Sequence, residues 1–437
     1  MSVLGRERTS TEQFESTCSR QSASTVLAVL VASLPILYQF NSPLSFLSLG
    51  ELLLIPAVVF YLVKDFGKIV LDRNLALFYL IPIGLTFIAY LIPNNYFDIM
   101  AFGRLTARIT LYYFLIIICA RRIDIRFFLK VYTCIAGAMC ALLLLQCFFH
   151  YCTSVELPVM RSFCEILYEY PGSKSLTGKE YYQTFGFRPA ALFTEPSYFA
   201  FYIIPLVILL LFVSEKQSPF VAWIAKKRVP IALFLTVVSL LSSSSASLFI
   251  FALIWGLYLI GLLKKNQTKK NSLRGFIILA AALMVALVLY SLGLFDVLID
   301  RTMKGASFEH RVLRGLVIFE TLDPLHQIFG VGLNNHAAYI ETNNIITAFD
   351  ESTVRFSAIA DIANRLITSG IIGFVALIWF VVVLFHSSRS KVEKVLVVVL
   401  ALNFCFNWWQ YSFRFAFMMI LIYLVRDWMK CKKAESE

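Results

Sequence analysis

Residues 197–213 read SYFAFYIIPLVILLLFV and carry no charged side chain. A run of roughly 20 mostly apolar residues is long enough to cross a membrane as a helix. Comparable runs recur along the chain, so the sequence predicts an all-α, polytopic membrane protein whose residues 1–437 form a single membrane domain. About 12 transmembrane helices are predicted, at 24–40, 44–63, 74–92, 105–120, 131–149, 197–213, 229–243, 246–263, 275–294, 367–386, 394–408 and 411–425.

The composition agrees with this interpretation. Of the 437 residues, 59% are hydrophobic and 15% are charged, whereas soluble proteins have about 45–50% apolar and about 25% charged residues. Water cannot solvate so much apolar surface, which excludes a cytosolic enzyme, a nucleic-acid-binding protein and a disordered scaffold. The net charge of +12 therefore needs an explanation other than nucleic acid.

The positions of lysine and arginine explain the charge as a topology signal. If the N-terminus is inside, 26 of the 39 basic residues fall on inner segments, which carry a net +15, and the outer segments carry −3. The sequence thus predicts cytoplasmic N- and C-termini, with the first span as an uncleaved signal anchor because no clear cleavage site follows it.

Two long segments, 150–196 and 295–366, fall on the outer side, and both show stretches with helical periodicity. Long loops in a compact protein are usually functional or disordered. Four of the five histidines lie there: His150, His310, His326 and His336. Cys152 and Cys164 share the first loop, where an oxidising compartment permits a disulfide, although two free thiols are equally compatible with the sequence.

The first long loop leads directly into the span at 197–213, and Arg188 and Glu195 bracket the entrance. Pro196 suits the first turn of a helix, and a carboxylate at Glu195 is favoured by the helix dipole. A simple membrane-entry cap with a snorkelling arginine explains the same residues.

The second long loop predicts a helix that begins near Ser307 and stops at Asp323-Pro324. Arg311 and Arg314 are three residues apart, so they share one face of this helix. Two guanidinium groups on one face suit a diphosphate, while an interfacial helix that meets lipid headgroups is the alternative.

The stretch Gly330-Val331-Gly332 predicts a turn that positions His336, although a lone histidine is more often structural than catalytic. Arg104 and Arg108 lie near the outer end of the fourth span, where both are expected to snorkel to the surface. Glu51 and Arg414 are also charged residues in predicted spans, and the sequence does not decide whether they are paired or reach the surface.

These motifs together resemble the bacterial O-antigen polymerase family, the Wzy-type branch of the O-antigen polymerase/ligase superfamily. The family shows an arginine, small residues, a phenylalanine and then Glu-Pro-Ser where a span opens, as in residues 188–197 here. After another outer loop it shows an arginine that opens a helix, a proline and Gly-x-Gly, matched by Arg311, Pro324 and residues 330–332. Residues 370–373, Gly-Ile-Ile-Gly, and the serine-rich turn after the seventh span also fit.

Two departures from the family pattern stand out. Ala190 or Ala191 occupies the place where the family usually has a glycine between the arginine and Glu-Pro-Ser. Many ligases have a His-Asn pair ahead of the Gly-x-x-Gly helix, but residues 360–364 read Ala-Asp-Ile-Ala-Asn. The second departure speaks against a ligase and leaves the general base open.

The resemblance implies a GT-C-like glycosyltransferase in the bacterial inner membrane. Such an enzyme joins undecaprenyl-diphosphate-linked oligosaccharide repeat units at the periplasmic face, for O-antigen of lipopolysaccharide or for capsule or exopolysaccharide. Its partners are those lipid-linked glycans, membrane lipid and, in the same pathway, a chain-length regulator and a flippase, with no nucleic acid. We expect no cofactor and no metal, because the outer loops contain no Asp-x-Asp and arginines can neutralise the leaving diphosphate.

Two groups of functional residues follow. The diphosphate is expected to bind Arg188, Arg311 and Arg314, and Arg188 and Arg311 are expected to meet at one site. The base that deprotonates the acceptor hydroxyl is expected among Glu195, His336 and Asp361, with His310 as a further possibility.

Three other functions remain as alternatives. An O-antigen ligase uses the same donor with a lipid A–core acceptor. A lipid-linked oligosaccharide flippase or another transporter belongs to a different class, but transporters often show internal repeats, and the two long loops are unlike each other. A structural or assembly protein does not explain why titratable residues are concentrated in two outer loops.

Overall fold

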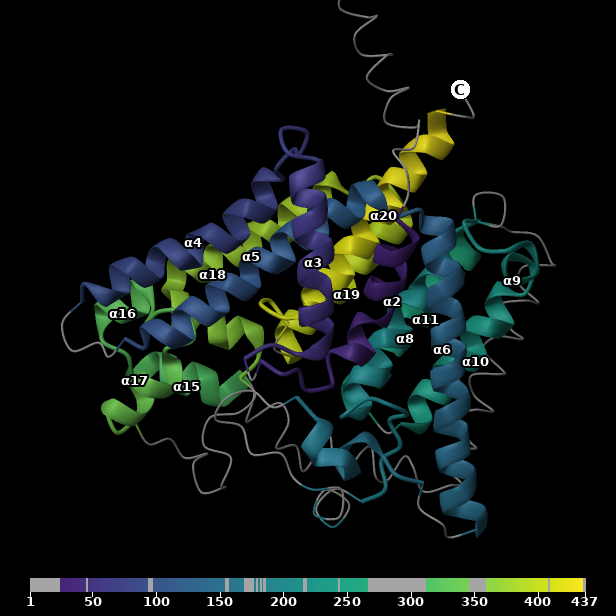
Figure 1. The fold of residues 1–437 in the computed structure, drawn as a ribbon, viewed down its shortest axis with the longest axis horizontal. Coiled ribbons are helices and arrows are strands. Elements are labelled where there is room, and N and C mark those ends of the chain that lie inside the picture. Colours follow the sequence, from purple (N-terminus) through teal and green to yellow (C-terminus); the bar gives the residue numbers. More distant parts are fainter. Residues whose placement is uncertain are drawn as a thin grey trace, which may run out of the picture.

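A computed structural model of the chain describes residues 24–44, 46–92, 97–153, 157–168, 177, 180, 183, 186–214, 218–242, 244–265, 312–345, 359–407 and 409–434. Within these ranges the chain is helical, with two isolated β-bridges and no strand. Long tilted helices form a bundle, and short helices lie at its edges (Figure 1). The helices are α2 (Thr25–Leu37), α3 (Leu49–Lys64), α4 (Arg73–Tyr90), α5 (Ile99–Arg122), α6 (Ile125–Phe148), η1 (Phe149–Thr153), η2 (Met160–Ile166), α8 (Pro196–Phe212), α9 (Ala222–Lys226), α10 (Arg228–Leu241), α11 (Ser245–Lys265), α15 (Arg314–Thr321), α16 (Pro324–Phe329), α17 (His336–Thr342), α18 (Asp361–Ser387), α19 (Lys391–Phe406) and α20 (Phe413–Ala434).

Helices coincide with the predicted spans wherever the structure describes them. The span predicted at 275–294 lies outside the described residues. Four helices, α4, α5, α18 and α6 with its extension to Thr153, are long and apolar enough to cross a membrane, and α2, α8, α10 and α11 are shorter apolar helices. The chain is therefore all-helical, as expected, and its apolar helices fit insertion into a membrane. The short helices expected in the two long loops are η1, η2 and α15–α17.

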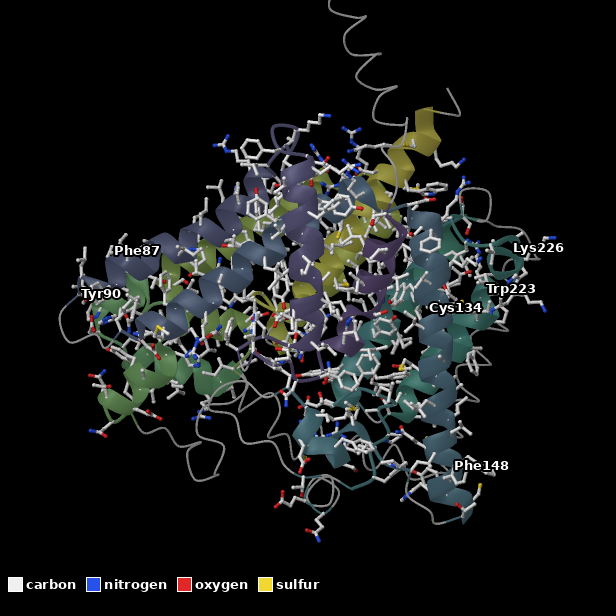
Figure 2. The ribbon with its side chains drawn as sticks, in the orientation of Figure 1. Phe87, Tyr90, Cys134, Phe148, Trp223 and Lys226 are labelled. Carbon is white, nitrogen blue, oxygen red and sulfur yellow. The ribbon has the colours of Figure 1, made fainter. Side chains whose placement is uncertain are left out.

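Apolar residues cover the outside of the bundle as well as its centre. Phe87, Phe148 and Trp223 are more than half exposed, and they lie at the periphery (Figure 2). By contrast, every residue of 199–211 in α8 and of 415–425 in α20 is buried. A helix that is apolar on all sides is stable where protein or lipid surrounds it completely, and here neighbouring helices surround α8 and α20.

The ends of the helices sort into two opposite sets. One set, which we call the basic end, contains residues 64–73, 121–126, 387–394 and 426–432. Arg122 pairs there with Asp65, and Arg426 Nε lies 3.3 Å from Glu393 Oε2. These segments are all among those predicted to lie inside, so the alternation of the helices agrees with the charge pattern.

The other set, the loop end, gathers segments predicted to lie outside. Asn41 Nδ2 donates to the Glu165 carbonyl at 3.1 Å, and Thr194 Oγ1 donates to Gln39 Oε1 at 2.6 Å. These contacts join the turn after α2 to the first long loop. The short helices α15, α16 and α17 pack at one side of the bundle (Figure 1).

Arg108 is a correction to the sequence analysis. It does not snorkel: its side chain is buried, and Nε donates to Glu51 Oε1 at 2.6 Å. Its Nη2 also donates to the Phe46 carbonyl and the Tyr168 hydroxyl. A buried charge is tolerated when it is paired and fully hydrogen-bonded, so the ion pair answers the question that Glu51 left open.

Helix α18 is broken at Gly370, whose φ of 63° and ψ of −169° are not helical. The break coincides with the Gly-Ile-Ile-Gly stretch, where the resemblance places the end of one helix and the start of the next span. The Val331 and Gly332 N–H groups donate to the Ile367 and Thr368 carbonyls at 2.9 and 3.0 Å. A helix that is interrupted inside an apolar bundle needs such partners for its freed backbone groups.

Two glycines allow the chain to approach the break. A Cβ atom on Gly330 would lie 2.3 Å from the Ser369 nitrogen, and one on Gly370 would lie 2.1 Å from the Ile328 carbonyl oxygen. Both glycines also have positive φ, 83° and 63°. The turn predicted at 330–332 is thus the segment that packs against the break in α18 and hydrogen-bonds to its carbonyl groups.

We expect Gly370→Ala and Gly330→Ala to destabilise the protein, because backbone strain at such dihedral angles costs about 1–3 kcal/mol before the clashes are counted. Thermal unfolding in detergent measures the effect. Gly137→Ala in α6 is the control, since nothing lies within 4 Å of a Cβ there. Equal unfolding midpoints for Gly370→Ala and Gly137→Ala would contradict the role of the break.

Candidate functional site

Glu195 occupies the N-cap of α8, with Pro196 in the first turn, as the sequence predicts. Arg161 from η2 donates through Nη2 to Glu195 Oε1 at 3.0 Å and through Nε to the Thr194 carbonyl at 3.0 Å. Ser197 Oγ donates to Glu195 Oε2 at 3.2 Å. Both carboxylate oxygens are therefore held, while the Glu195 side chain keeps 34% of its surface exposed. Arg161, which the sequence analysis did not single out, is an ion-pair partner of Glu195.

Two buried glutamines fix the turn that precedes Glu195. Gln146 Oε1 accepts from the Ala191 N–H at 3.0 Å, and Gln39 Oε1 accepts from the Thr194 N–H at 3.3 Å. Ala191 has a φ of 52°, a left-handed conformation that favours glycine. The departure from the family pattern thus falls on a position whose backbone suits a glycine.

Arg414, left open by the sequence, lies beside the start of α8. Its guanidinium carbon is 3.7 Å from the centre of the Tyr198 ring. A small cleft opens next to it, with room for about one water-sized group in ≈ 20 Å³. The polar residues that line the cleft are Ser197, Ser244, Ser247, Asn403, Asn407 and Arg414. The cleft joins the Glu-Pro-Ser stretch, the serine turn and the turn between α19 and α20.

Asp361 is fully buried at the start of α18. Its Oδ2 accepts the N–H groups of Trp409 at 2.6 Å and Gln410 at 3.0 Å. Asp361 therefore holds the turn that carries Arg414, which is a positioning role.

Arg314 and His336 come together from α15 and α17. Arg314 is 4% exposed and His336 is half-buried. Burial and then the positive charge of Arg314 lower the pKa of His336 to about 4. His336 is therefore neutral at pH 7, and its buried Nδ1 makes no hydrogen bond within the described ranges.

The start of α18 connects the pair Arg314 and His336 with the residues around Glu195 and Arg414. A Cβ atom on Gly315, next to Arg314, would meet Ala363 and Ile359 at 2.5 and 2.8 Å, so α15 lies directly on this segment. Asp361 connects it in turn to the turn that carries Arg414. His336 and Glu195 thus belong to the same loop end of the bundle.

Other predicted residues are only partly placed. Arg188 is half-buried after Phe187, whose ring stacks on His150 with centroids 3.7 Å apart. Arg311 and His310 lie outside the described residues, so the expected meeting of Arg188 and Arg311 stays a prediction. Cys152 and Cys164 are free thiols.

Arg414, which the sequence analysis left open, and Arg161, which it missed, differ in how visible they are in the sequence. Arg414 is a charge in an otherwise apolar segment, which by itself indicates a functional or paired position. Arg161 stands in an irregular loop, 34 residues before Glu195, and nothing in the local pattern connects the two. Comparison of the chain with protein-family models and with curated proteins found no match.

We expect Ala191→Gly to leave the protein at least as stable, because the left-handed conformation costs an alanine roughly 1–2 kcal/mol. Ala190→Gly is the control: its φ is not positive, so the added chain entropy should lower stability by about 0.5–1 kcal/mol. Unfolding midpoints in detergent compare the two variants. A larger loss for Ala191→Gly than for Ala190→Gly would be the contrary result.

We expect His336 to make stability depend on pH between about 4 and 6.5. In the unfolded chain the pKa of His336 is about 6.5, whereas in the folded protein it is about 4. Between these values the unfolded chain binds more protons than the folded protein. The free energy of unfolding therefore falls as the pH drops through this window, by roughly 3 kcal/mol at most. Unfolding of wild type and His336→Gln across the window measures the difference. Parallel curves for the two proteins would refute the shift.

Proposed function

We propose that this protein is a GT-C-type polysaccharide polymerase. It joins undecaprenyl-diphosphate-linked oligosaccharide repeat units at the periplasmic face of a bacterial inner membrane, across which it forms about 12 spans with both termini in the cytoplasm. The support is the motif resemblance together with one structural observation. Side chains from two loops far apart in sequence, Glu195 with Arg161 and His336 with Arg314, lie at the same end of the bundle as Arg414.

The reaction asks for two kinds of chemistry at that end. The leaving diphosphate gains negative charge as the sugar–phosphate bond breaks, and guanidinium groups stabilise it. Arg188, Arg311 and Arg314 are the proposed ligands of the diphosphate. Arginine suits this task better than lysine, because its planar fork binds two oxygens at once.

The acceptor hydroxyl must lose a proton to a base. Glu195 is our first choice, because its carboxylate is fixed by Arg161 and Ser197 and stays partly exposed. His336 is the second choice, since it is neutral at pH 7. Asp361 ranks below both, because its Oδ2 is engaged by the turn at 409–410.

A transporter of lipid-linked oligosaccharides is the second candidate, and one observation favours it. Discontinuous membrane helices often form the substrate sites of secondary transporters, and α18 is discontinuous at Gly370. A ligase is less favoured, because residues 360–364 lack the His-Asn pair.

Purified protein in detergent distinguishes the polymerase from the transporter. We expect polymer to form on lipid-linked repeat units without any membrane gradient, and also in excess EDTA, because arginine supplies the positive charge. A transporter makes no polymer in detergent. Strict dependence on an added divalent cation would overturn the arginine mechanism.

Variants then assign the roles. We expect Glu195→Gln to reduce polymer formation by about 100-fold or more and His336→Ala to retain it at equal protein level. Arg188→Lys should impair the reaction because a point charge does not replace the fork. Full activity of Glu195→Gln removes Glu195 as the base, and loss of activity in His336→Ala alone transfers that role to His336.

A further inference from the structure

A groove runs along the outer surface of the bundle between α3 and α5, with a volume of ≈ 420 Å³. Its walls are mostly apolar, with Leu47, Ile55, Met100 and Leu111 among them. Met100 is 68% exposed, so the groove faces whatever surrounds the bundle. Two arginines, Arg104 and Arg108, interrupt the apolar lining.

The two arginines differ in charge balance. Arg108 is neutralised by Glu51, which is itself fully buried. Arg104 is exposed, and within the described part of the chain it has no ion-pair or hydrogen-bond partner. The groove therefore carries one uncompensated positive charge amid apolar walls. This pattern matches an apolar chain with an anionic head, since a charge in an apolar setting is costly unless it is paired.

Hydrogen bonds connect the groove to the candidate site at two places. At the first, Arg108 donates to the Tyr168 hydroxyl, and the Tyr168 N–H donates to the carbonyl of Gln39, whose side chain holds Thr194. At the second, Asn334 Nδ2 donates to the Ala101 carbonyl at 3.3 Å, one turn before Arg104. Asn334 lies two residues before His336.

Arg104 lies near the start of α5, at the loop end of the bundle. It is six residues beyond Asp98, the N-cap of α5, and a helix rises about 1.5 Å per residue. Arg104 thus lies about 9 Å along the helix axis from the start of α5.

We propose that this groove binds the polyprenyl chain and the lipid-proximal phosphate of the lipid-linked substrate, while Arg188, Arg311 and Arg314 stay the proposed ligands of the phosphate that carries the sugar. Arg104 contacts a phosphate, and the first prenyl units lie along Ile55, Met100 and Leu111. The attached glycan then extends towards the neighbouring Glu195 and His336. This inference rests on the proposed function, because it identifies where that reaction's lipid carrier is held.

The full chain in dodecyl maltoside and undecaprenyl diphosphate as the probe test this binding. The rise of the unfolding midpoint with lipid concentration gives an apparent Kd. We expect Arg104→Gln to weaken binding at least about tenfold, as loss of a charge-assisted contact does. Gly103→Leu should weaken it similarly by filling the groove, because nothing lies within 4 Å of a Cβ at Gly103. Gly137→Leu in α6, equally open, is the matched control.

Each other result has a defined meaning. Wild-type affinity in Arg104→Gln overturns the proposal and leaves Arg104 as a snorkelling residue. Equal stabilisation by undecaprenol overturns the phosphate contact. Equal competition by phosphatidylglycerol added to the same micelles overturns the choice of ligand and shows a general phospholipid site. If Arg104→Gln weakens lipid binding but the wild-type protein makes no polymer, the proposed function is refuted and this inference is not. Polymer formation with unchanged binding in Arg104→Gln refutes this inference alone.

Discussion

The open backbone of α18 at Gly370 is the constraint on which the loop end of the molecule depends. An unsatisfied buried carbonyl in apolar surroundings costs several kcal/mol, so a helix that breaks inside an apolar bundle must find donors. Val331 and Gly332 supply them, which fixes the segment between α16 and α17 against the bundle. Arg365 adds a third contact, from Nε to the Gly373 carbonyl at 3.1 Å. The position of His336 follows from this pairing of backbones.

Buried guanidinium groups perform the same task elsewhere. Arg365 is fully buried and donates to the Phe78 carbonyl of α4 at 2.9 Å and to the Tyr411 hydroxyl. Arg108 joins α5 to α3 and to the turn at Phe46. A guanidinium has five donors in a rigid plane, so one residue connects several segments at once.

Much of the fold was predictable from the sequence, because its signal is local. Apolar runs, Asp323-Pro324 and the serine turn each mark an element through a few neighbouring residues, and the helices begin and end close to them. The pairs that build the site are not local. Glu51 and Arg108 are 57 residues apart, and Arg161 and Glu195 are 34 apart. Periodicity reports which face a residue occupies and says nothing about which distant residue it meets, so Arg108 was expected at the surface and Arg161 was overlooked.

The enclosure of α8 has a consequence for how the chain is assembled. Its sequence is among the most apolar in the protein, so it partitions into lipid readily on its own, yet in the finished fold α10, α11, α19 and α20 take the place of lipid around it. The last of these begins only at Phe413. Ribosomes must therefore finish nearly the whole chain before α8 exchanges its lipid neighbours for protein. In a truncated product that ends before α20, α8 and Glu195 at its start lack this last neighbouring helix.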